Sequence, residues 1–485
     1  MSDPLALLPL AAAAGGGRLG DFEAQQLVAA GVTLLQRCAP LVRALSGRRS
    51  AILLPASPAF LTALAASDGR GAVLVNPLAS PLEIAAQLRE ADVGAVFTVT
   101  PLAARVAGDL PLVLLDDAPH SARYVDAGAT RDVDLGNHHG LAIEGERDVP
   151  GRDEEAAVVF TSAMAGRPLA AVLSHRNLIA NARSTVEAAA NTADDHVLAL
   201  LPFSHLFGLT VTAMAPLFAG ARVTTMDRYA PPRAAELLAG GTITELVGVP
   251  AVFHSLLAAI ERRGGGIGAL RLCICGGAPL GRELQDRWFD ATGVELRQGY
   301  GLTEAAPVCL FNRVDRPNAR GTLGVPFPGV EVTVRAPLAG NGALTAELAR
   351  GAPGEICVRG DNVFRGYLGG ASGGLAVRDR WLYTGDGGTM NADGTVVFDG
   401  VLKPMFTRNG FNIYPAEIRR AVMELAGVDD VVVRPVPQPA REHDIALEVR
   451  GAATVDQVRA WCEHRLSSYK QPAEISVTDA SQPPR

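Results

Sequence analysis

Three apolar runs separated by helix-length segments between residues 51 and 99 place the strongest constraint on the fold. The runs AILLP, GAVLVNP and GAVFTV predict buried strands, and the segments 58–66 and 81–91 between them predict helices. Strands that alternate with helices in this way pair in parallel, with the helices covering the sheet. The sequence therefore predicts an α/β fold with a mostly parallel sheet.

Length, charge and cysteine usage restrict the class of protein. A chain of 485 residues exceeds one core, so we expect two or more domains. A net charge of −7 without a basic block argues against a nucleic-acid partner. Six cysteines without CxxC or Cys/His spacing indicate neither a disulfide framework nor a metal site, and we expect no bound metal from this pattern. The N-terminal apolar run is too short for membrane insertion, so a cytoplasmic enzyme is expected.

The chain changes character twice after this first region. Residues 22–45 read as a helix that Pro40 breaks, and residues 116–156 as an irregular link. From about 321 to 400, short strands between Gly/Pro turns predict a small β-barrel-like part. From about 404, helices and strands predict a small α+β unit. The expected architecture is a large N-terminal domain of helix-covered sheets, its β-rich part, and a C-terminal lid.

The segment 158–177 has the outline of a phosphate-binding loop. A buried strand (158–160) leads into a small-residue loop, a short strand (171–173) and a helix that starts at Ser174. Such loops bring backbone N–H groups close to phosphate. Yet the loop has one glycine, Gly166, while Met164 lies at its centre and Leu169 stands where a cation is expected. The segment therefore lacks much of the chemistry that holds a triphosphate.

Seven motifs follow one another in a fixed order. They are the loop at 161–169, PFSHLFGL (202–209), GVPAVF (248–253), GGAPL (276–280), QGYGLTE (298–304), YTGDGG (383–388) and NGFNIYPAEI (409–418). In these motifs the chain resembles the adenylate-forming superfamily of acyl- and aryl-CoA synthetases, luciferases and peptide-synthetase adenylation domains. The resemblance implies an N-terminal domain (1–402) and a lid (403–485). It also implies that a carboxylate is activated with ATP and passed to a pantetheine thiol.

The resemblance assigns roles to individual positions. Glu304 corresponds to the carboxylate that binds magnesium, Thr303 to a phosphate contact, Tyr300 to the aromatic on adenine, and Asp386 to the ribose contact. His205 corresponds to an imidazole that orients a carboxylate or takes a thiol proton, although a purely structural histidine is an equal alternative. Gly276 and Gly277 correspond to the strip that separates the adenine and acyl sites, and Phe207 to the tract that borders the acyl pocket. The expected walls of the acyl pocket are Val249, Phe253, Gly299 and Gly324.

The thiol side of the resemblance is intact in sequence. Gly410 and Phe411 correspond to the lid loop that forms the pantetheine tunnel, and Lys403 to the hinge between the two lid orientations. Thr161 and Ser162 are what remains of the hydroxyl groups in the phosphate loop.

Three elements that bind nucleotide in the adenylate-forming superfamily differ in this sequence. The phosphate loop carries Ala163, Met164, Ala165 and Leu169, and Val401 replaces an arginine. Pro404 follows the hinge and restricts its torsions. The sequence also stops at Arg485, just short of the lysine expected near the end of the lid. These departures predict loss of ATP chemistry, so Thr161, Ser162 and Asp386 are expected to be vestigial.

The sequence thus favours an ATP-independent acyltransferase that moves an acyl or aryl group from a coenzyme A thioester to the phosphopantetheine thiol of a carrier protein. A covalent variant would use Cys309, which is more simply a buried apolar residue. One alternative is an ATP-dependent ligase, and another is a non-catalytic subunit that recruits a carrier protein. The Ala-, Gly- and Arg-rich composition suggests a GC-rich bacterial source and, by analogy, secondary metabolism.

Overall fold

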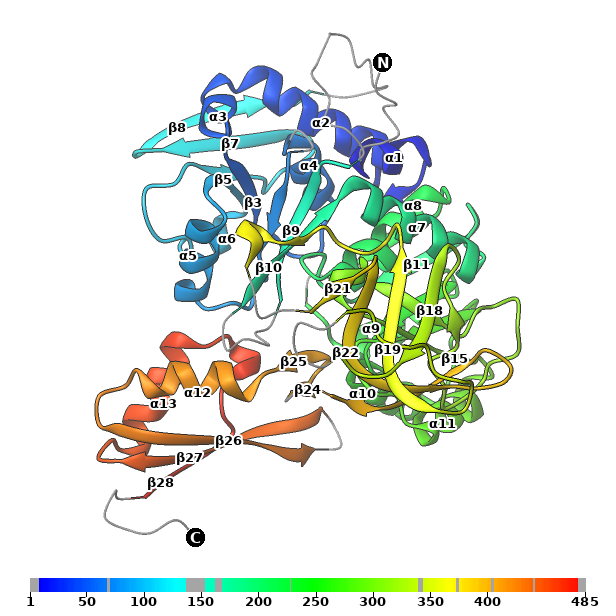
Figure 1. The fold of residues 1–485 in the computed structure, drawn as a ribbon. Helices are drawn as coiled ribbons and strands as arrows, with labels where there is room; N and C mark the ends of the chain where they lie inside the picture. Colours follow the sequence, from blue (N-terminus) through cyan, green and yellow to red (C-terminus); the bar gives the residue numbers. More distant parts are fainter. Residues whose placement is uncertain are drawn as a thin grey trace.

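Two nine-stranded sheets form the large N-terminal part of the molecule (Figure 1). The computed structural model describes residues 8–67, 70–136, 153–161, 168–226, 228–338, 343–371, 375–402, 405–438 and 441–478. The first sheet contains, in spatial order, β20 (Gly366–Tyr367), β10 (Leu169–Ser174), β9 (Glu155–Thr161), β4 (Ala72–Leu74), β3 (Arg49–Ile52), β5 (Val93–Thr98), β6 (Leu112–Leu114), β7 (Ser121–Asp126) and β8 (Ala129–Asp134). Its centre, from β9 to β6, is parallel, as the alternation in sequence predicts.

The second sheet is built in the same way. It contains, in spatial order, β17 (Val325–Pro326), β16 (Val308–Phe311), β15 (Leu296–Gly301), β14 (Leu272–Cys275), β13 (Glu245–Gly248), β11 (His196–Ala199), β12 (Arg222–Thr225), β1 (Arg18–Leu19) and β2 (Phe22–Glu23). The strands from β15 to β12 are parallel, so their carboxyl ends meet at one edge. Ligands of open α/β sheets bind at this edge.

Helices form layers on both sides of the two sheets. Those described in the N-terminal part are α1 (Leu8–Ala14), α2 (Ala24–Arg37), α3 (Ala39–Ala44), α4 (Pro58–Ala66), α5 (Pro81–Glu90), α6 (Thr100–Ala103), α7 (His175–Ala189), α8 (Ala215–Phe218), α9 (Pro231–Ala239), α10 (Pro250–Arg263) and α11 (Arg282–Thr292). The largest core cluster joins the facing sides of both sheets through α2, α4 and α7. Helix α5 covers the outer face of the first sheet, and α9 to α11 cover the outer face of the second.

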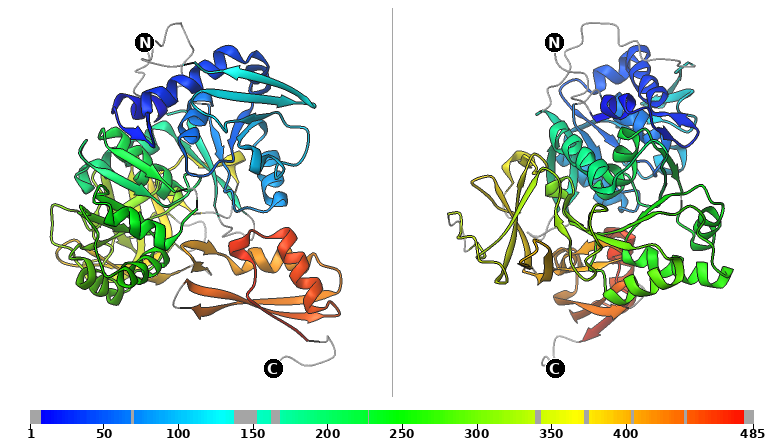
Figure 2. Two further views of the ribbon diagram at one scale, coloured as in Figure 1. Left: turned by 180° about the vertical axis from the view of Figure 1, so that it is seen from behind. Right: turned by 90° about the vertical axis from the view of Figure 1, so that its right-hand side faces the viewer.

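The β-rich region forms a five-stranded sheet at one side of the second sheet (Figure 2). It contains β18 (Val330–Arg335), β19 (Pro353–Gly360), β22 (Trp381–Met390), β21 (Val377–Arg378) and β23 (Val396–Val401), and all its pairings are antiparallel. The part that was expected to be barrel-like is this sheet.

The C-terminal residues form a separate unit with its own core beneath the two large sheets (Figures 1 and 2). It contains β24 (Phe406–Arg408), β25 (Phe411–Ile413), α12 (Pro415–Met423), β26 (Val428–Gln438), β27 (Glu442–Gly451), α13 (Val455–Arg465), the 3₁₀ turn η5 (Ser468–Lys470) and β28 (Glu474–Thr478). The fold class is therefore confirmed: a large α/β part and a small α+β unit.

Several elements differ from what the sequence predicted. The link at 116–156 contains the hairpin β7–β8, and its residues 137–152 lie outside the described part of the chain. The PFSHLFGL tract ends in a π-helix, η2 (Phe207–Met214), which periodicity did not predict. The segment before QGYGLTE contains α11, which was not predicted either. Among the described residues, no helix is both long and apolar enough to cross a membrane.

The phosphate-loop segment begins and ends in regular structure. Strands β9 and β10 pair antiparallel, and Leu169 lies opposite Thr161. The Ser174 side chain caps α7 by accepting from the N–H of Asn177, which explains why the helix starts there. The loop residues between the strands, including Ser162 to Gly166, lie outside the described part of the chain, as do Lys403 and Pro404.

Candidate functional site

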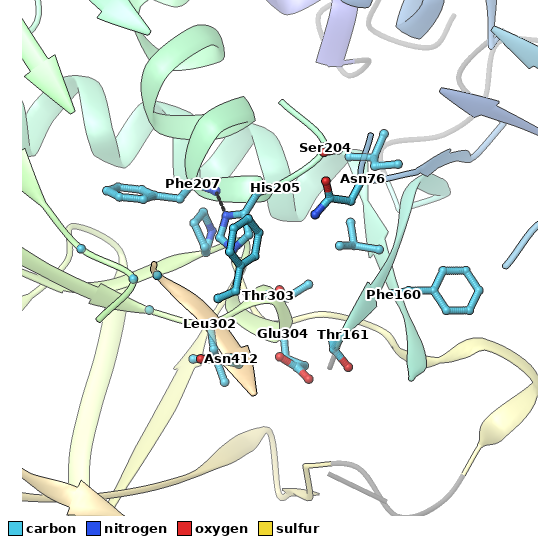
Figure 3. Close-up of a pocket in the computed structure, with 18 of the residues that line it drawn as sticks. Asn76, Phe160, Thr161, Ser204, His205, Phe207, Leu302, Thr303, Glu304 and Asn412 are labelled. Carbon is cyan, nitrogen blue, oxygen red and sulfur yellow. Dashed lines mark hydrogen bonds between the residues drawn. The ribbon is translucent and has the colours of Figure 1, made fainter. Parts of the chain in front are cut away.

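One pocket collects most of the residues that the motifs single out. It lies where β9, β15 and the 3₁₀ turn η3 (Thr303–Ala305) of the large part meet β25 and η5 of the C-terminal unit. Thr161, Thr303 and Glu304 face this space, and Asn412 of β25 lines it from the other unit (Figure 3). Residues from at least five motifs that are distant in sequence therefore share one cavity.

Glu304 is a buried carboxylate held by a neutral donor. It is 6% exposed, and the Tyr367 hydroxyl donates to its Oε1 over 2.7 Å. The same hydroxyl accepts from the N–H of Leu375 over 3.1 Å. Burial and the neighbouring Glu304 charge raise the pKa of Tyr367, so the phenol stays protonated and donates. In this bond Glu304 therefore accepts from a phenol and not from a basic group.

Tyr300 and Asp386 form a second phenol–carboxylate pair. Tyr300 is the penultimate residue of β15, and its hydroxyl donates to Asp386 Oδ2 over 2.7 Å across 86 residues of sequence. Burial and the Asp386 charge raise the pKa of Tyr300 well above its usual value. Asp386 lies in β22, directly opposite Val401 of β23. The side chain at the position of the expected arginine is therefore an aliphatic neighbour of Asp386, and it is 40% exposed.

His205 lines the pocket at the start of η2. Its Nδ1 accepts from the N–H of Phe207 over 3.2 Å, the contact dashed in Figure 3. Surrounding protein atoms lower the pKa of His205 to about 4, so the ring is neutral at pH 7. With Nδ1 accepting, the proton resides on Nε2. The ring is thus equipped to donate a hydrogen bond and is a weak proton acceptor.

An apolar wall extends behind these polar groups. A Cβ at Gly276 would lie 3.1 Å from the Gly299 carbonyl oxygen and from Phe207 Cζ, so a side chain there would be tightly packed against both. Gly299 in turn contacts Phe311, whose ring meets Phe327 edge-on at 6.4 Å between centroids. Further members of this wall are Val211, Ile274 and Val308. The wall therefore presents an apolar surface, and the absence of side chains at Gly276 and Gly299 leaves space beside it.

The loop at Gly410 closes the cavity from the C-terminal unit. Gly410 has φ +76°, and a Cβ there would lie 2.6 Å from Val249 Cγ1. Gly277, with φ +79°, lies between Val249 and the Gly410 carbonyl. The neighbouring Phe411 ring stacks on Tyr469 with centroids 4.2 Å apart. Glycine at both positions thus lets the two backbones approach closely where they line the pocket.

Of the other residues predicted for the site, some line the pocket and some do not. Thr161 reaches the pocket, and its hydroxyl donates to the Leu169 carbonyl over 3.2 Å. Leu169 also lines the pocket although it is 1% exposed, so an aliphatic side chain stands at the site of the expected cation. Gly324 does not line the pocket: its left-handed backbone packs on Phe311. Phe253 is buried against Trp288 beneath α11, away from the pocket lining.

The six cysteines are buried and unpaired. Burial raises the pKa of the Cys309 thiol, which disfavours the thiolate that a covalent mechanism needs. Cys309 therefore behaves as a small core residue.

Several lining residues were not predicted as site residues. Glu83, Tyr367, Tyr414 and Lys470 all line the pocket. The sequence SPLE at 80–83 is a capping-box pattern, which would have placed Glu83 in a first helical turn but not in a site. Lys470 lies in the segment SSYKQP (467–472), in which no site residue was predicted. Tyr414 lies within the motif NGFNIYPAEI but was assigned no role, and no local pattern marks Tyr367.

The donor set limits how a metal would be held. Within the described residues, no group of three or more His, Cys, Asp or Glu side chains could form a metal cage. Glu304 alone, facing a pocket, suits Mg²⁺ of the kind that takes one or two protein carboxylates and completes its shell with phosphate oxygens. The residues present therefore fit a metal that arrives with a nucleotide.

Comparison with known proteins gives a family and its chemistry. The model of the AMP-binding enzyme family matches residues 41–368. A feruloyl-CoA synthase from Amycolatopsis is 30% identical over 441 residues, which cover 89% of this chain and 85% of that protein. This relative is named for forming a coenzyme A thioester.

Two solved structures of similar sequence identity superpose on this chain to different degrees. A malonyl-CoA ligase with methylmalonyl-CoA and AMP bound superposes with a TM-score of 0.76 at 25% identity, covering 96% of both chains. ATP-bound MatB from Rhodopseudomonas palustris superposes with a TM-score of 0.67 at 26% identity, covering 99% of this chain and 96% of that chain. At equal sequence similarity, this chain is closer to the complex that holds a thioester and AMP.

These comparisons correct the main functional expectation. The relative is a CoA synthase, and the similar structures are a ligase with AMP and a protein that holds ATP, so the ATP-free acyltransferase was wrong and the ligase alternative fits better. The weak point of the prediction was physical. The prediction relied on missing groups in three elements and left out that a metal ion can also neutralise phosphate charge.

Proposed function

Because the chain belongs to the AMP-binding enzyme family, we propose that it is an ATP-dependent ligase that activates a hydrophobic carboxylic acid and transfers it to a thiol. The observation that carries the proposal is the grouping of Thr303, Glu304 and Tyr300 on one side of a pocket with an apolar wall on the other. One side suits a magnesium nucleotide, and the other suits an acyl group.

The first step would join the acid to AMP. The substrate carboxylate attacks the α-phosphorus of ATP, an acyl–phosphate bond forms, and pyrophosphate leaves. Magnesium, when bound, would neutralise phosphate charge at Glu304. Thr303 would donate to a phosphate oxygen, and Asp386 would accept from the ribose hydroxyls while Tyr300 holds it in place. These groups act by positioning and by electrostatics.

The second step would pass the acyl group to sulfur. The thiol sulfur attacks the carbonyl carbon, the bond to phosphate breaks, AMP leaves, and the thiol proton passes to solvent. His205, neutral at pH 7, would donate its Nε2–H to the acyl oxygen instead of taking the thiol proton. Gly277 and Gly410, which both line the pocket, would border the pantetheine arm.

The lining favours an uncharged acyl or aryl group. In the described part of the lining, the side chains with full charge are Glu83, Glu304 and Lys470. Glu83 and Lys470 pair with each other over 2.9 Å, and Glu304 accepts from Tyr367. The wall from Gly276 to Phe327 offers no charge to a second carboxylate. We therefore propose medium-chain acids or small aromatic acids as substrates, and not dicarboxylates.

We further propose that the structure represents the arrangement for thiol transfer. Support comes from the Gly410 loop, which lies against Gly277, and from the greater similarity to the ligase complex with methylmalonyl-CoA and AMP. Coenzyme A is the acceptor that the relatives favour. A carrier protein would present the same pantetheine arm and is an alternative acceptor.

A substrate panel tests the proposal. The protein is incubated with ATP, Mg²⁺ and medium-chain, cinnamic, benzoic and dicarboxylic acids, and pyrophosphate release is measured with and without coenzyme A. We expect release that requires both ATP and a monocarboxylic acid, and acyl-CoA when coenzyme A is added. A parallel arm replaces coenzyme A by a pantetheinylated carrier protein. No pyrophosphate with any acid would overturn the proposal.

A further inference from the structure

A single carboxylate of the large part, Glu83, receives hydrogen bonds from both units of the molecule. Its Oε2 accepts from the N–H of Ser80 over 2.8 Å, which completes the capping box of α5. The same oxygen accepts from the hydroxyl of Ser467 over 2.5 Å, and Oε1 accepts from Lys470 Nζ over 2.9 Å. A group that first serves to cap a helix thus also holds η5 of the C-terminal unit.

Lys470 connects Glu83 to a second buried carboxylate. Its Nζ also donates to Glu417 Oε1 over 2.6 Å, and Lys470 is only 4% exposed. Burial opposes the ammonium charge, but Tyr469, Glu417 and Glu83 outweigh this effect, so the pKa of Lys470 is raised. Glu417 belongs to α12 of the same unit as Lys470, so Glu83 is the one member of this ion cluster from the large part.

The ion cluster continues into the loop that closes the pocket. Tyr469 precedes Lys470, and its ring stacks on Phe411 at an interplanar angle of 18°. Phe411 follows Gly410, which lies against Val249 and beside Gly277. A second link ties α5 to the C-terminal unit, because the Ser80 hydroxyl donates to the Arg465 carbonyl over 3.2 Å. Holding Lys470 at α5 therefore also holds the Gly410 loop.

We infer that Glu83 is a positioning residue for the acyl-transfer step, which holds the C-terminal unit so that the Gly410 loop closes beside Gly277. The inference rests on the proposed function. Glu83 and Lys470 belong to different units, so rotation of the C-terminal unit away from α5 would separate the two charges. Contacts present in one arrangement and absent in another shift the balance between them. Glu83 thus favours transfer over adenylation.

Measuring adenylation and acyl transfer separately distinguishes a positioning role of Glu83 from a general role in stability. We expect Glu83→Gln to slow single-turnover transfer from preformed acyl-adenylate to coenzyme A by about tenfold or more. ATP–pyrophosphate exchange, which reports adenylation alone, should stay within about twofold of the parent or rise. The matched control is Glu90→Gln at the exposed end of the same helix, which should change neither rate. Equal slowing of both half-reactions, or of neither, would overturn the inference.

A measurement without substrate keeps the test independent of the proposed function. Small-angle X-ray scattering should give a larger radius of gyration for Glu83→Gln than for the parent and for Glu90→Gln, because the C-terminal unit is released. If no acid supports adenylation, this measurement still decides the role of Glu83. An unchanged radius for Glu83→Gln would overturn the inference even if the enzyme is active.

Discussion

The molecule holds buried carboxylates in two different ways. At the side proposed to bind nucleotide, Glu304 of the pocket lining and Asp386, the partner of the lining residue Tyr300, each accept from a tyrosine hydroxyl. At the boundary with the C-terminal unit, Glu83 and Glu417 share the ammonium of Lys470. A phenol satisfies a carboxylate and leaves its charge available to a cation or a donor from a ligand. An ion pair cancels the charge and fixes two elements together. The first arrangement suits a binding site, and the second suits a mechanical contact.

The largest effect is expected when the ammonium of Lys470, which Glu83 and Glu417 share, is removed. Lys470→Met leaves two buried carboxylates facing each other, so we expect a loss of about 3–5 kcal/mol in the free energy of unfolding of the C-terminal unit. Urea denaturation followed by Trp461 fluorescence measures this loss. The matched control is Arg434→Met, which breaks an exposed pair with Glu448 in the same unit and should cost under about 1 kcal/mol. Equal effects of both variants would remove the distinction.

A carboxylate at the nucleotide side should matter for chemistry more than for stability. Glu304→Gln keeps the acceptor for Tyr367 but loses the charge that suits Mg²⁺, so we expect pyrophosphate exchange to fall by about 100-fold. The melting temperature should change little. Glu331→Gln, which breaks an exposed pair with Arg359, provides the control for exchange and for melting. A large loss of stability with Glu304→Gln and preserved exchange would reverse the assignment.

Removing the Tyr300 hydroxyl should lower the free energy of unfolding by less than removing the Lys470 ammonium. Tyr300→Phe removes one neutral donor from Asp386, so we expect a decrease of about 1 kcal/mol in unfolding free energy. Calorimetry in the absence of nucleotide measures the decrease, and Tyr229→Phe, which removes a hydroxyl bonded to Ser255, is the control. A cost that equals that of Lys470→Met would show that phenol and ammonium hold their carboxylates equally.

The smallest expected effect is that of pH on the contact between Glu83 and Lys470. Burial opposes ionisation of Glu83, but Lys470, Ser467 and Ser80 outweigh it and lower the pKa of Glu83 below 4.5. This stabilisation is present above pH 4.5 and is lost as the pH falls through the lowered value. The pKa of Lys470 is raised above 10.5, so its contribution is complete below that pH and is lost as the pH rises further. Scattering should show a constant radius of gyration from about pH 5 to 10. An increase inside this window would contradict the expectation.

Much of the fold could be predicted because its information is local. The alternation between residues 51 and 99 specifies parallel strands and covering helices, and β3, β4 and β5 are parallel as expected. The hairpin β7–β8 was missed because its outer strand is mostly exposed and carries no apolar pattern. The π-helix η2 was missed because every residue in it is buried, so no face is distinguished by polarity.

Sequence by itself determined which residue types were available for the site: Thr303, Glu304 and Tyr300 lie within five positions of one strand end and its turn, so local structure alone brings them together. Tertiary structure alone decided their partners. Tyr300 meets Asp386 across 86 residues, and Glu83 meets Lys470 across 387. Such pairs depend on how whole sheets and units pack, and no local propensity encodes that distance. The departures in the phosphate loop suggested lost chemistry for the same reason, because sequence showed the missing groups but not the pocket that remains.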